Sequence, residues 1–188
     1  MKQRQKDYLF VIGLVAVVAA IGFYTSYTTY RVKFEFPTQQ TDLQESDFLV
    51  KSEVAEICVG REPLANVQKW FGEGQFLGMS TIYQPPGKEF QLWFTKKQNT
   101  VWIFQSSHPM FSTYRGIQVG DPLEKVIKAY GPNYARVSSG GSRADYDLQY
   151  GTASEGTATF RMHRDCVSKL VINRDPETLA QKQSEALN

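Results

Sequence analysis

Cysteine and histidine are scarce in this sequence, which has two of each among 188 residues. Cys58 and Cys166 lack the close spacing of a zinc site, and only His108 and His163 could add nitrogen ligands. The sequence also has no nucleophile elbow around a serine and no glycine-rich phosphate loop. We therefore expect no metal, no cofactor and no enzymatic activity.

The densest group of ionisable residues is Asp145, Asp147, Arg161 and His163. Paired acids beside a histidine can catalyse proton transfer, but only in a pocket that shifts their pKa values. These four residues alternate along predicted strands, a pattern more typical of cross-strand ion pairs. They are therefore better candidates for binding than for catalysis.

Charge of one sign is not in excess beyond the N-terminus. The whole chain has 21 basic and 19 acidic residues, of which the first 30 residues hold three and one. The remainder thus has 18 of each and a formal net charge of zero. Binding of nucleic acid depends on a basic excess that releases counterions, so we expect no nucleic-acid partner.

Residues Tyr8 to Tyr30 form an uncharged run of 23 residues. At about 1.5 Å per residue, 20 of them reach about 30 Å, the thickness of a hydrocarbon core. Tyrosine and phenylalanine lie at both ends of the run, and three basic residues precede it. This predicts a single-pass membrane protein with a cytoplasmic N-terminus and an extracytoplasmic domain.

Two alternatives to the anchor remain. A cleaved signal peptide would use Ala20 and Gly22 as small residues before the cut, although bulky Phe23 and Tyr24 follow. A buried core helix is the other alternative. In an exported domain, the even number of cysteines predicts a disulfide between Cys58 and Cys166, with two unpaired thiols as the alternative.

Two copies of one pattern lie about 60 residues apart, from Ile57 to Gly72 and from Ile117 to Gly131. Each has a Val-Gly pair, then a proline and a leucine, then a spaced apolar stripe and a closing glycine. Pro63 and Pro122 suit the first position of a helix, and the closing glycine ends it. Each copy therefore predicts a short helix, and alternating segments after each helix predict strands.

We expect an α+β fold: an N-terminal transmembrane helix, followed by two tandem helix-plus-antiparallel-strand repeats whose helices form a layer on one face of an antiparallel sheet. The expected boundaries are residues 1–30 for the cytoplasmic stub and anchor, 31–54 for a linker, 55–112 for the first repeat, 113–174 for the second, and 175–188 for a polar tail.

The stretch from Gly116 to Leu123, with Tyr130-Gly131-Pro132 and the short strands after it, resembles the tandem-repeat module of beta-lactamase-inhibitory proteins. It is also similar to small envelope lipoprotein domains of the outer-membrane assembly type. The resemblance covers Ala55 to Arg174. It implies a protein-binding or envelope role without a cofactor. The single cysteine in each copy lies at a non-equivalent place, so the within-repeat disulfides of these families do not carry over.

One helix layer covers only one face of an antiparallel sheet, so the other face should be open. An even turn at Lys97-Gln98 or Gln98-Asn99 puts Trp93, Trp102 and Phe104 on that open face. The opposite, core face then holds Phe90, Leu92, Phe94, Val101 and Ile103. In the second repeat, alternation puts Asp147, Arg161 and His163 on the open face.

These six residues, Trp93, Trp102, Phe104, Asp147, Arg161 and His163, are the predicted partner-binding site. The predicted function is a membrane-anchored, extracytoplasmic, non-catalytic binding module that recognises a protein or a cell-envelope component. The alternative is a structural subunit of a larger membrane or envelope complex.

Overall fold

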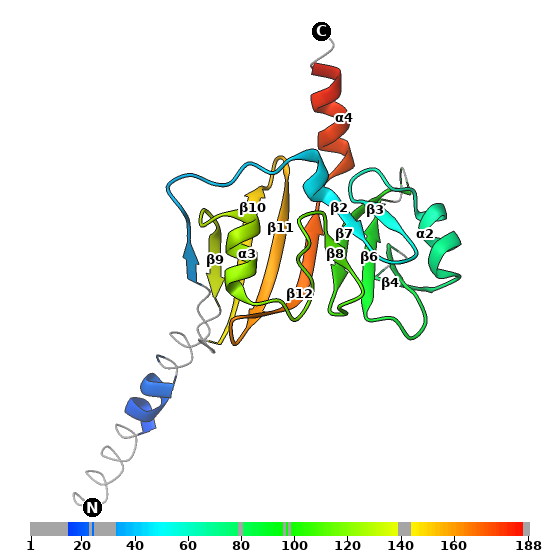
Figure 1. The fold of residues 1–188 in the computed structure, drawn as a ribbon. Coiled ribbons are helices and arrows are strands. Elements are labelled where there is room, and N and C mark those ends of the chain that lie inside the picture. Colours follow the sequence, from blue (N-terminus) through cyan, green and yellow to red (C-terminus); the bar gives the residue numbers. More distant parts are fainter. Residues whose placement is uncertain are drawn as a thin grey trace, which may run out of the picture.

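The computed structural model describes residues 15–22, 24, 33–78, 81–95, 97, 99–138 and 144–185 (Figure 1). Within these residues, most strands join one antiparallel sheet, here called the main sheet. Its order is β1 (Lys33–Glu35), β9 (Ala135–Ser138), β10 (Asp145–Thr152), β11 (Gly156–His163), β12 (Cys166–Asn173), β7 (Val101–Ser106), β6 (Phe90–Phe94), β5 (Ile82–Gln84) and β4 (Gln75–Leu77).

A second sheet, here called the small sheet, lies beside the helices on one face of the main sheet (Figure 1). It contains β3 (Glu56–Cys58), β2 (Leu49–Lys51) and β8 (Ser112–Thr113), and a 3₁₀ helix, η1 (Glu45–Phe48), precedes β2. The helices are α2 (Leu64–Phe71), α3 (Leu123–Tyr130) and α4 (Pro176–Glu185). Figure 1 shows α4 extending away from the sheets.

The two short helices α2 and α3 begin and end in the same way. Pro63 and Pro122 precede them in extended conformation. Gly72 and Gly131 follow them at φ 82° and 90°, a left-handed backbone conformation that favours glycine. Each helix buries its apolar stripe against the main sheet, which fixes the covered face of that sheet.

The core lies between the main sheet and the layer formed by the helices and the small sheet. Residues opposite one another on adjacent strands form a buried row across five strands: Leu148, Phe160, Leu170, Ser106 and Phe90. From α3, the ring of Tyr130 contacts the ring of Phe160 at 5.0 Å, and from α2 the ring of Phe71 contacts that of Phe90 at 4.9 Å. Both helices thus share one continuous core.

The predicted fold class is wrong in its architecture. The structure is mostly sheet with few helices, rather than two helix-plus-strand repeats. The strands after α2 and those after α3 belong to one sheet because β7 pairs with β12, with Phe104 opposite Ile172 and Ser106 opposite Leu170. Hydrogen bonding across that join continues the sheet, so the two halves have no separate sheets of their own.

The predicted membrane anchor is also contradicted. The described residues contain no helix that is both long and apolar enough to span a membrane. Of the uncharged run Tyr8 to Tyr30, residues 15–22 and Tyr24 are helical, and the rest lies outside the described residues. The predictions of a single-pass membrane protein and of an extracytoplasmic location are therefore not carried further.

A smaller expectation also changes. The segment 31–54, expected to be a linker, contains β1, η1 and β2, and its strands pair with β9, β3 and β8. After the first helix, where alternation predicts strands, residues 76–77 and 82–84 belong to two paired strands, β4 and β5, with Phe76 opposite Tyr83. The partners of β1 and β2 in these sheets, β9 and β8, lie far away in the sequence, where no local pattern specifies the pairing.

Candidate functional site

The face of the main sheet opposite α2 and α3 is here called the open face. Side chains that point to it from the central strands stay half-exposed, whereas their neighbours on the covered face are buried. On β10 and β11 this alternation is as predicted: Tyr146, Leu148 and Phe160 are buried, while Asp147 is half-exposed and Arg161 is exposed. The predicted site residues were all expected on the open face, so their observed positions are compared with that expectation residue by residue.

Trp93 and Trp102 are both half-exposed, on β6 and β7. Trp93 lies opposite Ile103, so these two side chains share the open face. The sequence had placed Ile103 in the core, and that assignment is wrong because Ile103 is half-exposed. The aromatic part of the predicted site is thus Trp93 and Trp102, with Ile103 added.

Phe104, the third predicted aromatic residue, is fully buried on the covered face. The register between β6 and β7 shifts at Trp102: Trp93 is opposite Ile103, but the next residue, Phe94, is opposite Val101. One extra residue in β7 reverses the facing that strict alternation had assigned. The cause is the start of β7, where the N–H of Val101 donates to Glu62 O at 2.9 Å and its carbonyl accepts from Gly60 at 2.7 Å.

The charged residues of the predicted site form cross-strand pairs. Arg161 donates to both carboxylate oxygens of Asp147, at 2.9 and 3.1 Å, and Nδ1 of His163 lies 2.6 Å from Asp145 Oδ1. The hydrogen bond to Asp147 raises the pKa of Arg161. Burial lowers the pKa of Lys169, which lies opposite Arg161 on β12. These ionic contacts hold the charges in place on the surface of the sheet.

The structure does not bring the aromatic and charged residues together. On β12, Lys169 lies opposite Arg161, and Asn173 lies opposite Ile103, which in turn is opposite Trp93. The two sets of residues therefore belong to different cross-strand rows. Four residues of strand separate these rows by about 13 Å, and the two sets are also several strands apart. They lie in different parts of one face, so a partner that touches both must reach across β12.

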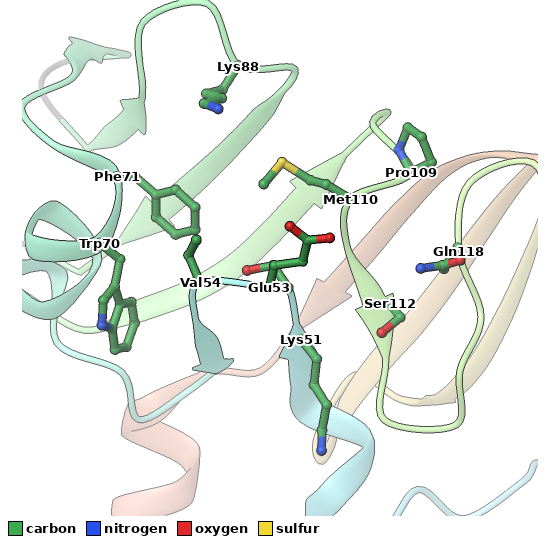
Figure 2. A pocket seen from close by; sticks show the side chains of 11 residues that line it. Lys51, Glu53, Val54, Trp70, Phe71, Lys88, Pro109, Met110, Ser112 and Gln118 are labelled. Carbon is green, nitrogen blue, oxygen red and sulfur yellow. The ribbon is translucent and has the colours of Figure 1, made fainter.

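A hollow of about 730 Å³ lies on the covered side of the main sheet, between the β2–β3 turn, α2 and the loop before β8 (Figure 2). Its apolar lining is Val54, Trp70, Phe71 and Met110. Val54 is 57% exposed and Trp70 is 37% exposed. Phe71 is fixed from behind by contacts with Phe90, as described above. A volume of about 730 Å³ falls within the size range of ligand sites.

Charged groups surround this hollow. Lys51 forms a salt bridge with Glu56, with 3.2 Å between Nζ and Oε1, and its Nζ lies 5.3 Å from the ring centre of Tyr114. Figure 2 shows Glu53 beside Val54 and below Met110, with Lys88 near the top of the view. The sequence did not predict this site. The available signal was Trp70, which falls outside the apolar stripe of its helix.

The predicted disulfide is not formed, and both cysteines are free thiols. Cys58, on β3, is close enough to Arg174 for the charge to act on its thiol, and Arg174 follows the last residue of β12. Cys166 is the first residue of that strand. Eight residues of strand, about 26 Å, separate these two ends, and a disulfide tolerates at most about 7 Å between Cα atoms.

No protein-family model, curated protein or solved structure matches this chain.

Proposed function

We propose that this chain is a non-catalytic binding module that recognises a partner macromolecule through the open face of the main sheet. The observation that carries the proposal is the position of Trp93 and Trp102, half-exposed on the face that the helices leave uncovered. Tryptophan offers a large apolar contact area and is enriched among the residues that dominate binding free energies.

Rigidity of the supporting sheet favours the same proposal. Trp93 and Ile103 lie on paired strands in the middle of the main sheet, and their neighbours Leu92 and Phe104 are fully buried. A contact surface that is already fixed in the unbound chain loses little conformational entropy when a partner binds. The resemblance noted from the sequence, to modules that bind proteins, agrees with this role as an analogy.

The hollow in Figure 2 is the competing location for the same function. The two locations can be separated because each has a tryptophan of its own. Trp102 belongs to the open face and Trp70 lines the hollow. Alanine variants of these two tryptophans are therefore controls for each other.

The test is affinity capture from an extract of the source organism on immobilised wild-type, Trp102→Ala and Trp70→Ala chains. We expect one set of macromolecules to be retained by wild-type and Trp70→Ala and lost by Trp102→Ala. Truncation of an anchoring aromatic costs about 2 kcal/mol, or about 30-fold in affinity. Loss with Trp70→Ala but not with Trp102→Ala would move the function to the hollow and contradict the proposal.

A further inference from the structure

Two parallel rows of side chains cross the open face on strands β4 to β7. The first, here called the apolar row, contains Leu77, Ile82, Trp93 and Ile103, each opposite the next on the adjacent strand. Leu77 is 40% exposed, and the other three are half-exposed. Rows run perpendicular to the strands, so this one is a narrow apolar strip about three strand spacings, or about 14 Å, long.

The second row, here called the glutamine row, contains Gln75, Gln84, Gln91 and Gln105. Gln75 lies opposite Gln84 and Gln91 opposite Gln105, and Nε2 of Gln91 donates to Oε1 of Gln84 at 2.9 Å. Each glutamine is two residues from a member of the apolar row on the same strand, so the two rows are about 7 Å apart. Gln75 is exposed, and the other three side chains are partly exposed.

A shallow hollow of about 230 Å³ lies beside the glutamine row, lined by Gln84, Gln91, Gln105, Glu89, Phe90 and Ser107. Its polar lining consists of three amides, one hydroxyl and one carboxylate. An amide both donates and accepts hydrogen bonds, as does a hydroxyl group. The hollow thus offers a mixed set of donors and acceptors with little formal charge.

Neither row contains a charged residue, and this decides which kind of partner fits. A nucleic acid needs several cations along its backbone. The centre of a protein interface is typically apolar, with polar groups at its rim. Here the glutamine row runs alongside the apolar row over all four strands. The partner must therefore be a repeating chain, each unit of which has an apolar side and an edge with hydroxyl or amide groups.

Resting on the proposed function of the open face, we propose that its partner is a linear, uncharged glycan that lies across β4 to β7 along these two rows. The C–H face of a sugar ring packs on Trp93 and its apolar neighbours, and the ring hydroxyls exchange hydrogen bonds with the glutamine row. Adjacent strands are about 4.8 Å apart, close to the length of one pyranose unit. Successive sugars therefore meet successive strands.

The test is isothermal titration of the full chain with cellohexaose, chitohexaose, xylohexaose and maltohexaose. We expect at least one of them to bind. Trp93→Ala should weaken that binding at least about ten-fold, as for an anchoring aromatic, and Gln91→Ala by about three-fold. Trp70→Ala, beside the other hollow, should stay within two-fold of wild-type. Far-UV circular dichroism checks that each variant folds. If Trp93→Ala does not fold, Gln91→Ala still tests the proposal, because Gln91 is half-exposed.

The outcomes separate this proposal from the proposed function. If none of the four hexasaccharides binds at millimolar concentration, the glycan proposal is wrong. If capture of a protein partner is nevertheless lost in Trp102→Ala, the open face keeps its binding role with a protein instead. If a hexasaccharide binds and only Trp70→Ala weakens it, the glycan site lies in the other hollow. If capture and titration are both insensitive to every open-face variant, both proposals fail.

Discussion

An arginine is held by both oxygens of an aspartate on each side of the main sheet. On the covered side, Arg115 donates to both oxygens of Asp47 at 2.6 Å, and Asp47 is fully buried. On the open face, the Arg161–Asp147 contacts are longer, and the two side chains are 52% and 24% exposed. The covered pair ties η1 to the end of α3, where Arg115 also donates to Ala129 O at 2.9 Å. The open pair ties only neighbouring strands.

The same contrast exists between adjacent residues of β7. Phe104 is fully buried and contacts Phe111 at 4.9 Å between ring centres, whereas Ile103 is half-exposed. Stability should therefore depend on the covered side, and substitutions on the open face should be nearly neutral for folding. This separation makes the open face available for binding, and it can be tested pair by pair.

The largest effect is expected from Phe104→Ala. Removing a fully buried ring should lower the free energy of unfolding by about 3–5 kcal/mol, because transfer and cavity terms add. Ile103→Ala, its neighbour on the open face, should cost only about 1 kcal/mol. Urea denaturation followed by circular dichroism measures both. Equal losses would show that the open face is part of a core.

Asp47→Asn should follow, with a loss of about 3 kcal/mol in unfolding free energy, because Arg115 would keep its charge in a largely buried site. The matched open-face variant Asp147→Asn should lose less than about 1 kcal/mol. Urea denaturation of the two variants at neutral pH gives the comparison directly. A loss at Asp147 as large as that at Asp47 would contradict the assignment of the two faces.

Glu45 provides an intermediate case. Its carboxylate accepts from Nη2 of buried Arg174 at 2.5 Å while remaining half-exposed, and this hydrogen bond lowers the pKa of Glu45. A lowered pKa in the folded state stabilises the fold above the ordinary value of 4.5, and the stabilisation is lost as the pH falls through the folded pKa. Glu45→Gln should cost up to about 1 kcal/mol at pH 7. Its difference from wild-type should shrink below pH 4.5, and a difference that grows in acid would contradict this.

The two thiols should differ in reactivity, as the two sides of the main sheet differ in exposure. Cys166 is exposed beside the open face, whereas Cys58 is half-buried in the small sheet, and burial raises the pKa of its thiol. With a thiol-reactive disulfide reagent at pH 8, Cys166 should react at least about ten-fold faster. Cys166→Ser and Cys58→Ser chains assign the two phases. A chain with no reactive thiol before reduction would instead contain a disulfide.

Local sequence signals were enough to position α2 and α3. Their prolines and closing glycines set where each begins and ends, and these depend only on neighbouring backbone geometry. Alternation likewise assigned the two faces of β10 and β11, where Tyr146 is buried and Asp147 is half-exposed. In both cases the information lies within one element or one tight hairpin.

Long-range hydrogen bonds account for what the sequence did not predict. The join between β7 and β12 decides that the sheet is continuous, and no local pattern specifies it. The extra residue at Trp102 depends on the bonds between Val101 and the Gly60–Glu62 segment, about 40 residues earlier. That single shift moved Phe104 into the core and Ile103 to the open face, so one of the three predicted aromatic residues was misassigned.

The most direct measurement of the open face is hydroxyl-radical footprinting of the free chain with mass spectrometry, each rate divided by that of the same residue in the unfolded chain. We predict that Trp70 is modified fastest, that Trp93 and Trp102 follow at clearly measurable rates, and that Phe104 is protected. If Trp93 and Trp102 were as protected as Phe104, that face would be covered and the binding role assigned to it would be wrong.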